Sequence, residues 1–134
     1  MSLKFYKCNR CGNVLEVVVD GKVNPMCCGK LMDELVPNTV DASNEKHVPV
    51  IKVEGNRVEV LVGEVEHPMI EAHFITNIYL HTNKEVRRVK LTPENEPKAV
   101  FYLAEDEEVI SAYEYCNLHG LWKKEYSDIL PPLS

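Results

Sequence analysis

The sequence lacks the long apolar runs that mark membrane proteins. No stretch approaches the roughly 20 apolar residues of a membrane span, and the first five residues, MSLKF, carry no apolar core of a signal peptide. These absences predict a cytoplasmic protein.

Concentrated positive charge is also missing. The net charge is −6 and no run of Lys or Arg exceeds two residues, whereas nucleic-acid binding needs a concentrated basic surface. Nucleic acid is therefore excluded as the expected partner. The sequence also contains no phosphate-binding glycine loop, no internal repeat, no low-complexity tract and no residue pattern typical of a helix of any length.

The sequence does contain five cysteines within 134 residues. That length allows one ordinary domain, or a small module followed by a domain of about 100 residues. In a reducing compartment an odd number of cysteines favours metal ligands or catalytic thiols over a disulfide framework. We therefore expect metal chemistry.

Residues 1–36 form a cysteine-rich unit with a β-type run over 14–19. Cys8 and Cys11 stand in a Cys-x-x-Cys-Gly knuckle, and Cys27 and Cys28 are adjacent before Gly29. A segment this short buries too little apolar surface to fold alone, so four thiolates on one metal would staple it. Adjacent cysteines can share an ion only through an irregular backbone, and four thiolates suit either zinc or iron.

A connecting segment at residues 35–44 places the domain boundary near residue 37. Beyond it, short β-type runs alternate with turn signals, which predicts an all-β fold with an antiparallel sandwich over residues 37–134. The acidic run at 105–108 is interpreted as a solvated turn. In the run 70–81, the alternation places Ile78 and Leu80 on one face and Ile75 and His81 on the other. The expected strands are 47–53, 57–63, 70–81, 86–91, 99–103, 109–115 and 121–126.

Five histidines lie in the second domain and none in the first. His47, His67, His73 and His119 lie near expected strand ends or turns, and loops at one end of a sandwich bring distant positions together. Cys116 and His119 stand three residues apart on a turn that Asn117 and Gly120 permit. A thiol and several imidazoles predict a transition-metal site. His81, at a strand end, is expected to be a solvated surface residue.

The motifs EKHVPV at 45–50, HPM at 67–69, EAH at 71–73 and CNLHGLW at 116–122, in this order and spacing, resemble desulfoferrodoxin, the two-iron superoxide reductase. The likeness covers nearly the whole chain. It implies a rubredoxin-like or desulforedoxin-like first domain whose Cys8, Cys11, Cys27 and Cys28 hold one iron. It also implies an immunoglobulin-like sandwich and a homodimer.

For the second centre, the resemblance implies a non-haem iron held by His47, His67, His73 and His119 as equatorial ligands and by Cys116 as the axial ligand. Five ligands leave one octahedral position open, and an open position distinguishes a reactive metal from a structural one. Superoxide takes one electron and two protons there and leaves as hydrogen peroxide, so the expected role is detoxification under oxidative stress. The electrons are expected from a rubredoxin-type donor.

Two residues next to His47 have expected catalytic roles. Lys46 supplies a local cation that guides superoxide into a chain of negative net charge. Glu45 is implied by the resemblance to reach the open position in the oxidised state, since a carboxylate suits ferric iron.

The rival interpretation is a non-catalytic electron carrier or metal-binding module. A blue-copper carrier is a weaker variant of it, because such sites use two histidines, a cysteine and a weak axial ligand. Met69 and Trp122, beside the ligands, are expected to pack or shield rather than bind the metal.

Overall fold

The computed structural model describes residues 2–128. The chain divides into two compact units, Met1–Val36 and Pro37–Ser134. Within the described part, no helix is long and apolar enough to cross a membrane.

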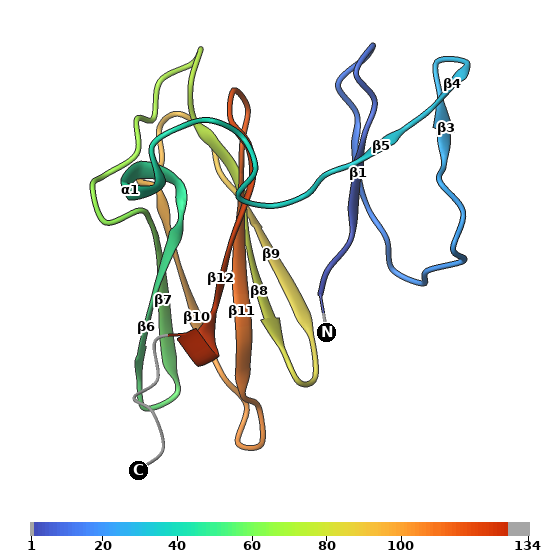
Figure 1. Ribbon diagram of the computed structural model, residues 1–134. Helices are drawn as coiled ribbons and strands as arrows, with labels where there is room; N and C mark the ends of the chain where they lie inside the picture. Colours follow the sequence, from blue (N-terminus) through green and yellow to red (C-terminus); the bar gives the residue numbers. More distant parts are fainter. Residues whose placement is uncertain (1, 129–134) are drawn as a thin grey trace. The chain divides into compact units, whose positions relative to one another are not determined.

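The first unit consists of two small antiparallel sheets. One sheet has the strand order β2-β1-β5 and the other is the β3-β4 hairpin (Figure 1). Tyr6, Cys8 and Met32 are its buried core, and Val17 and Cys27 pack against them. So small a core fits a unit that needs a metal to stabilise it. Its strands are β1 (Phe5–Lys7), β2 (Val14–Glu16), β3 (Met26–Cys27), β4 (Lys30–Leu31) and β5 (Asp33–Glu34).

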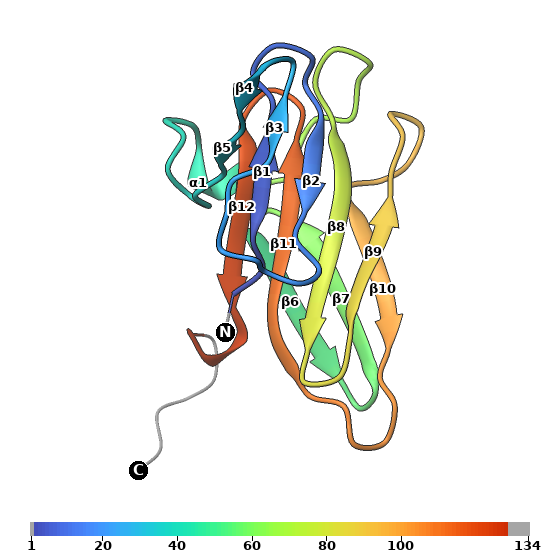
Figure 2. The ribbon, with the colours of Figure 1, turned by 90° about the vertical axis from the view of Figure 1, so that its right-hand side faces the viewer.

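The second unit has two antiparallel sheets, with strand orders β10-β7-β6 and β12-β11-β8-β9. Figure 2 shows the four-stranded sheet face on, with β6, β7 and β10 behind it. The elements are α1 (Asn44–His47), β6 (Pro49–Glu54), β7 (Arg57–Val62), β8 (Ile75–Thr82), β9 (Val86–Lys90), β10 (Lys98–Tyr102), β11 (Val109–Cys116), β12 (Gly120–Glu125) and the 3-10 turn η1 (Tyr126–Asp128).

A single hydrophobic core joins the two sheets of the second unit. Along β7, Val58, Val60 and Val62 are buried while the residues between them are partly exposed, which is the period-two pattern of a strand with one buried face. These valines share one cluster with Ile78 and Leu80 of β8, on the opposite sheet. The predicted all-β class is thus confirmed; the immunoglobulin-like topology remains a prediction.

The start of the first strand and the face of Ile75 differ from expectation in the second unit. A single helical turn, α1, precedes the first strand, so His47 ends a helix instead of starting a strand. Ile75 lies in the core with Ile78, because a register shift between Tyr115 and Cys116 leaves one residue of β8 unpaired. Such a β-bulge reverses the alternation of faces.

The acidic run is only partly a solvated turn. Glu107 is buried, and its carboxylate accepts hydrogen bonds from Thr82 Oγ1 at 2.6 Å and from the backbone N–H of Ala104 at 3.0 Å. It also pairs with Arg87. The other three acidic residues of the run are exposed. Sequence alone could not separate Glu107 from them, because its partners lie on distant strands.

Candidate metal centres

Four cysteine sulfurs gather in the first unit. Cys8, Cys11, Cys27 and Cys28 all place Sγ within 4.8 Å of one another. The Sγ atoms of Cys11 and Cys27 are 3.5 Å apart, and those of Cys27 and Cys28 are 4.0 Å apart. Metal–sulfur bonds of about 2.3 Å in a tetrahedron space the sulfurs about 3.8 Å apart. The four thiols therefore fit one tetrahedral metal ion.

The backbone of this unit turns the sulfurs inward. Cys28 has φ +53°, in the left-handed region that residues other than glycine seldom adopt, and this lets two adjacent cysteines face one point. The backbone N–H groups of Cys11 and Arg10 lower the pKa of the Cys8 thiol to about 6. A low pKa favours the thiolate, the form that binds metals.

Four imidazoles form a closed ring in the second unit. Successive rings, in the order His47, His67, His73, His119 and back to His47, have centroids 4.6 to 4.9 Å apart and interplanar angles of 79° to 90°. Across the ring, His47 and His73 are 6.3 Å apart. Four nitrogens can thus surround one central point.

In His47 and His67, one ring nitrogen donates a hydrogen bond to a backbone carbonyl, so the other ring nitrogen is the one that faces this central point. His47 donates from Nδ1 to the carbonyl of Ser43 at 2.7 Å, and His67 donates from Nδ1 to the carbonyl of Pro68 at 2.6 Å. Their free Nε2 atoms lie 3.3 Å apart, and His119 Nδ1 lies 2.9 Å from His47 Nε2. Metal–nitrogen bonds of about 2.1 Å at right angles give a spacing of about 3.0 Å.

Cys116, the last residue of β11, completes the cluster. Its Sγ lies 3.4 Å from His67 Nε2, and His47, His67, His73 and Cys116 offer ligand atoms within 4.8 Å of one another. Burial raises the pKa of the Cys116 thiol, and the backbone N–H groups of His119 and Leu118 act in the opposite direction. A buried thiol held by two N–H donors is prepared for a cation that would ionise it.

One further observation indicates a cation. Among the described residues, His73 Nε2 is buried without a hydrogen-bond partner, and such an orphaned atom is costly unless something binds it. Burial also lowers the pKa of His47 and His73 and brings that of His67 to about 4. Neutral imidazoles are the form that binds metals.

Short local segments position these ligands. His47 ends α1, while His67 and His73 lie on the loop between β7 and β8 (Figure 1). Cys116 ends β11 and pairs with Gly120, whose φ of +77° closes the hairpin that carries His119. The predicted site residues of the second domain are thus brought together, and Glu45 and Lys46 stand exposed beside them on α1.

Sequence reasoning missed the side chain of Asn117. Its Oδ1 accepts the N–H of Phe74 at 2.9 Å, and its Nδ2 donates to the carbonyl of Ala72 at 3.1 Å. These bonds enclose His73 on both sides. Asparagine next to a cysteine also suits a simple turn, so nothing in the sequence indicated these hydrogen bonds.

Trp122 contacts two of the four histidines. Trp122 stacks on His47 with centroids 5.0 Å apart and donates from Nε1 to the carbonyl of His119 at 2.9 Å, so it shields the cluster as expected.

His81 is not solvated: only 4 % of it is exposed. It lies within β8, paired with Val86 on one side and Ser111 on the other, rather than beyond the end of the strand.

Two family models match this chain. Residues 39–125 match the model described as Desulfoferrodoxin, and residues 2–35 match the desulfoferrodoxin N-terminal domain. The chain belongs to the desulfoferrodoxin family. A desulfoferrodoxin from Syntrophotalea carbinolica is 48 % identical over 123 residues, which cover 92 % of this chain and 96 % of that protein.

Relatives with another name are similar too. A superoxide reductase from Pyrococcus horikoshii is 40 % identical over 102 residues, which cover 63 % of this chain and 89 % of the relative. Among solved structures, the superoxide reductase from Treponema pallidum has a TM-score of 0.78 at 34 % identity, and the match covers 93 % of this chain and all of the other. The superoxide reductase (1Fe-SOR) from Giardia intestinalis matches 60 % of this chain with a TM-score of 0.52 and 35 % identity. The family inferred from the motifs is confirmed.

Proposed function

We propose that this protein is a superoxide reductase that converts superoxide to hydrogen peroxide with one electron and two protons. The observation that carries the proposal is the ring of four imidazoles with Cys116 beside it. Membership of the desulfoferrodoxin family and relatives named superoxide reductase support it.

We assign two non-haem iron ions to the two clusters. Cys8, Cys11, Cys27 and Cys28 would hold the first, and His47, His67, His73, His119 and Cys116 would hold the second. The fit of the second set rests on the unpartnered His73 Nε2 and on the spacings between ligand atoms. Ferrous iron in that set supplies the reducing electron, and the thiolate eases its oxidation.

Two neighbours of His47 act on the substrate path. Lys46 is exposed one residue before His47, and its ammonium group attracts superoxide toward the open sixth position in a chain of net charge −6. Glu45 is exposed on the same turn. Its carboxylate would serve as a further ligand in the oxidised protein, because hard oxygen ligands prefer ferric iron.

The first centre, closed by four thiolates, stores or relays an electron. Cys11 and Cys28 are exposed, which supports electron exchange at the surface with a small rubredoxin-type donor. All five cysteines are free, and this supports a reducing, cytoplasmic location. We also propose a homodimer, supported by the exposed apolar side chains of Val18, Val19 and Val23; sedimentation equilibrium measures its mass.

The test of function is rapid mixing of the reduced, iron-loaded protein with superoxide. We expect fast oxidation of the second centre, one peroxide per superoxide and little oxygen. Equal amounts of oxygen and peroxide would instead indicate a dismutase. Slow or absent oxidation, with both irons present, would indicate a non-catalytic electron carrier. Iron analysis and the visible spectrum of the same sample establish which metal each site holds.

A further inference from the structure

We propose that Gly63 is a positioning residue of the catalytic site. The absence of a side chain at this position lets the loop after β7 pack directly on the backbone of α1, and this contact determines where Glu45 and Lys46 stand. The consequence for turnover rests on the roles proposed above for those two residues. The contact itself does not depend on them.

The contact between Gly63 and α1 has no room for any side chain. A β-carbon at position 63 would lie 2.4 Å from the carbonyl oxygen of Glu45, 2.8 Å from the carbonyl carbon of Lys46 and 3.1 Å from that of Glu45. All three are backbone atoms, which cannot rotate away as the end of a side chain can. The backbone of Gly63 is outside the left-handed region, so the close approach alone requires glycine.

The same loop also binds the Glu45 carbonyl by a hydrogen bond. The backbone N–H of Val65 donates to Glu45 O at 3.0 Å. The loop is in turn closed by the N–H of His67, which donates to the carbonyl of Val62 at 3.2 Å. The loop that carries the ligand His67 therefore also holds the turn that carries Glu45 and Lys46.

The turn α1 has little internal stability of its own. It contains four residues, and the side chain of its N-cap residue, Ser43, makes no capping hydrogen bond. So short a helix is unstable without tertiary contacts. The packing on Gly63 and the Val65 hydrogen bond therefore contribute much of what fixes its position.

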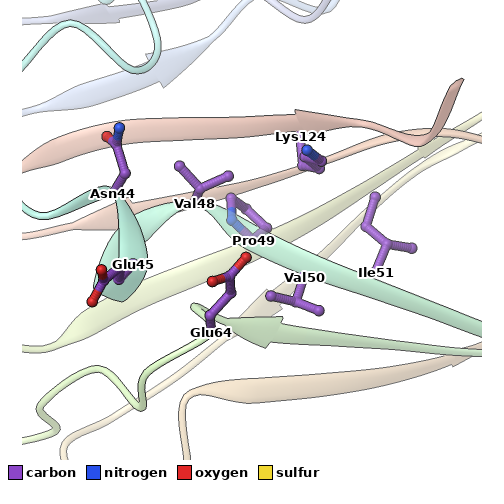
Figure 3. Close-up of a pocket in the computed structure, with 8 residues that line it drawn as sticks. All are labelled: Asn44, Glu45, Val48, Pro49, Val50, Ile51, Glu64 and Lys124. Carbon is purple, nitrogen blue, oxygen red and sulfur yellow. The ribbon is translucent and has the colours of Figure 1, made fainter. Parts of the chain in front are cut away.

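Space for a displaced turn exists beside α1. A pocket of about 300 Å³ is lined by Asn44 and Glu45 of α1, by Val48 after it, by Pro49 to Ile51 of β6, and by Glu64 and Lys124. Figure 3 shows Asn44 and Glu45 at one end of this pocket and Lys124 toward the other. A methyl group at position 63 would thus shift α1, because few side chains are packed beside the helix to oppose the movement.

The shift would affect three residues of the turn unequally. His47 is buried, bonded through Nδ1 to Ser43 and stacked on Trp122. Glu45 and Lys46 are exposed, and Gly63 lies against their carbonyl groups. We therefore expect Gly63→Ala to retain iron at the second site while it moves the cation and the carboxylate that serve the open position.

The experiment compares Gly63→Ala with Gly21→Ala in the full chain. Gly21 is a matched control, because a β-carbon there meets no atom within 4 Å and its φ is not left-handed. In the metal-free protein, amide hydrogen exchange at Val65 should accelerate by about tenfold in Gly63→Ala, since its hydrogen bond weakens. In the iron-loaded protein, oxidation by superoxide per iron should slow by about three- to tenfold at low salt and approach wild type at high salt.

These measurements distinguish a positioning role of Gly63 from a role in stability alone. Unchanged exchange at Val65 together with an unchanged rate and salt dependence would overturn the proposal, as would a slower rate that is equally slow at every salt concentration. If Gly63→Ala fails to fold, Val65→Pro removes the N–H donor to the same Glu45 carbonyl and should lower the rate with the same salt dependence; a wild-type profile there would contradict the proposal. If wild type itself does not reduce superoxide, the function is wrong, while the exchange measurement still tests the contact.

Discussion

The side-chain carbonyl of Asn117 accepts the backbone N–H of Phe74 at 2.9 Å. The amide of the same side chain donates to Ala72, and the backbone N–H of Asn117 donates to the carbonyl of Phe74 at 3.2 Å. Three bonds thus join the turn that carries Cys116 and His119 to the loop that carries His73. Ligands from two distant segments are held in one frame.

Removal of this side chain should loosen His73. We expect Asn117→Ala to weaken iron binding at the second site by roughly 10- to 100-fold, the usual effect of losing a group that orients a metal ligand. Competition with a chelator measures the affinity. Asn95→Ala is the control, because the Asn95 side chain likewise accepts a backbone N–H, that of Thr92 at 2.8 Å, on an exposed loop of the same unit. Equal affinities for both variants and wild type would contradict this role.

Cys116→Ser tests the axial assignment. The hydroxyl of serine is a poor ligand where a thiolate is needed, so the second centre should lose its thiolate-to-iron absorption band and most of its activity. The four-cysteine centre should keep its own band, since its ligands lie in the other unit. Absorption spectra of the oxidised variant distinguish the two. A retained band at the second centre would show that Cys116 is not a ligand.

The strands and the metal ligands could be predicted from the sequence for different reasons. Alternating side chains such as those of β7 predict strands directly, because period two follows from strand geometry. Residue types and turn positions predicted that the histidines gather in a transition-metal site, but which of them bind, and in which role, came only from the family motifs. Taken singly, each histidine matched an ordinary surface residue, because spacing alone does not require positions 20 residues apart, such as His47 and His67, to converge.

Features that depend on tertiary contacts could not be predicted from the sequence. Gly63 was predicted only as the last residue of a strand, and its close contact with the carbonyl of Glu45 was not predicted. Glu107 reads as one of four solvated carboxylates until Thr82 and Arg87 are seen on other strands. The face of Ile75 depends on a single unpaired residue in β8, and the sequence does not show where a β-bulge will reverse the alternation of faces. Each error came from a contact between segments far apart in the chain.

The two centres should function separately. Replacing the exposed Cys11 and Cys28 together by serine should remove iron and colour from the first centre. The rate at which superoxide oxidises the second centre should stay within about twofold of wild type, because no ligand of the imidazole cluster lies in the first unit. Rapid mixing with superoxide measures the rate, and loss of second-site oxidation would refute the separation.

Glu107 should stabilise the sandwich at neutral pH. Hydrogen bonds from Thr82 and the Ala104 N–H lower the pKa of its carboxyl below the ordinary value of 4.5. A carboxylate with a depressed folded pKa contributes stability that is complete above 4.5 and is lost as pH falls through the folded pKa. Glu107→Gln should therefore cost about 1–3 kcal/mol at pH 7, as for hydrogen bonds to a charged group, and less below pH 4.

Urea unfolding of metal-free wild type and Glu107→Gln, from pH 7 to pH 3, measures this difference. The exposed neighbour Glu105 provides the control, since Glu105→Gln removes the same charge without buried partners. The free-energy difference between wild type and Glu107→Gln should shrink as pH falls. A constant difference over the whole range would show that the ionised carboxylate is not the source of the stability.

Lys46 should govern how fast superoxide arrives. At low salt, Lys46→Ala should slow the second-order oxidation of the second centre by about tenfold, because one unit charge a few ångströms from the entry point changes the energy of the approaching anion by about 1.4 kcal/mol. Salt screens the charge in wild type, so the two rates should converge as ionic strength rises. Lys52→Ala is the matched control, since Lys52 is an exposed lysine on β6 and carries no proposed role. If both variants slow equally, net charge explains the effect; if only Lys46→Ala slows, and only at low salt, the cation acts at the site.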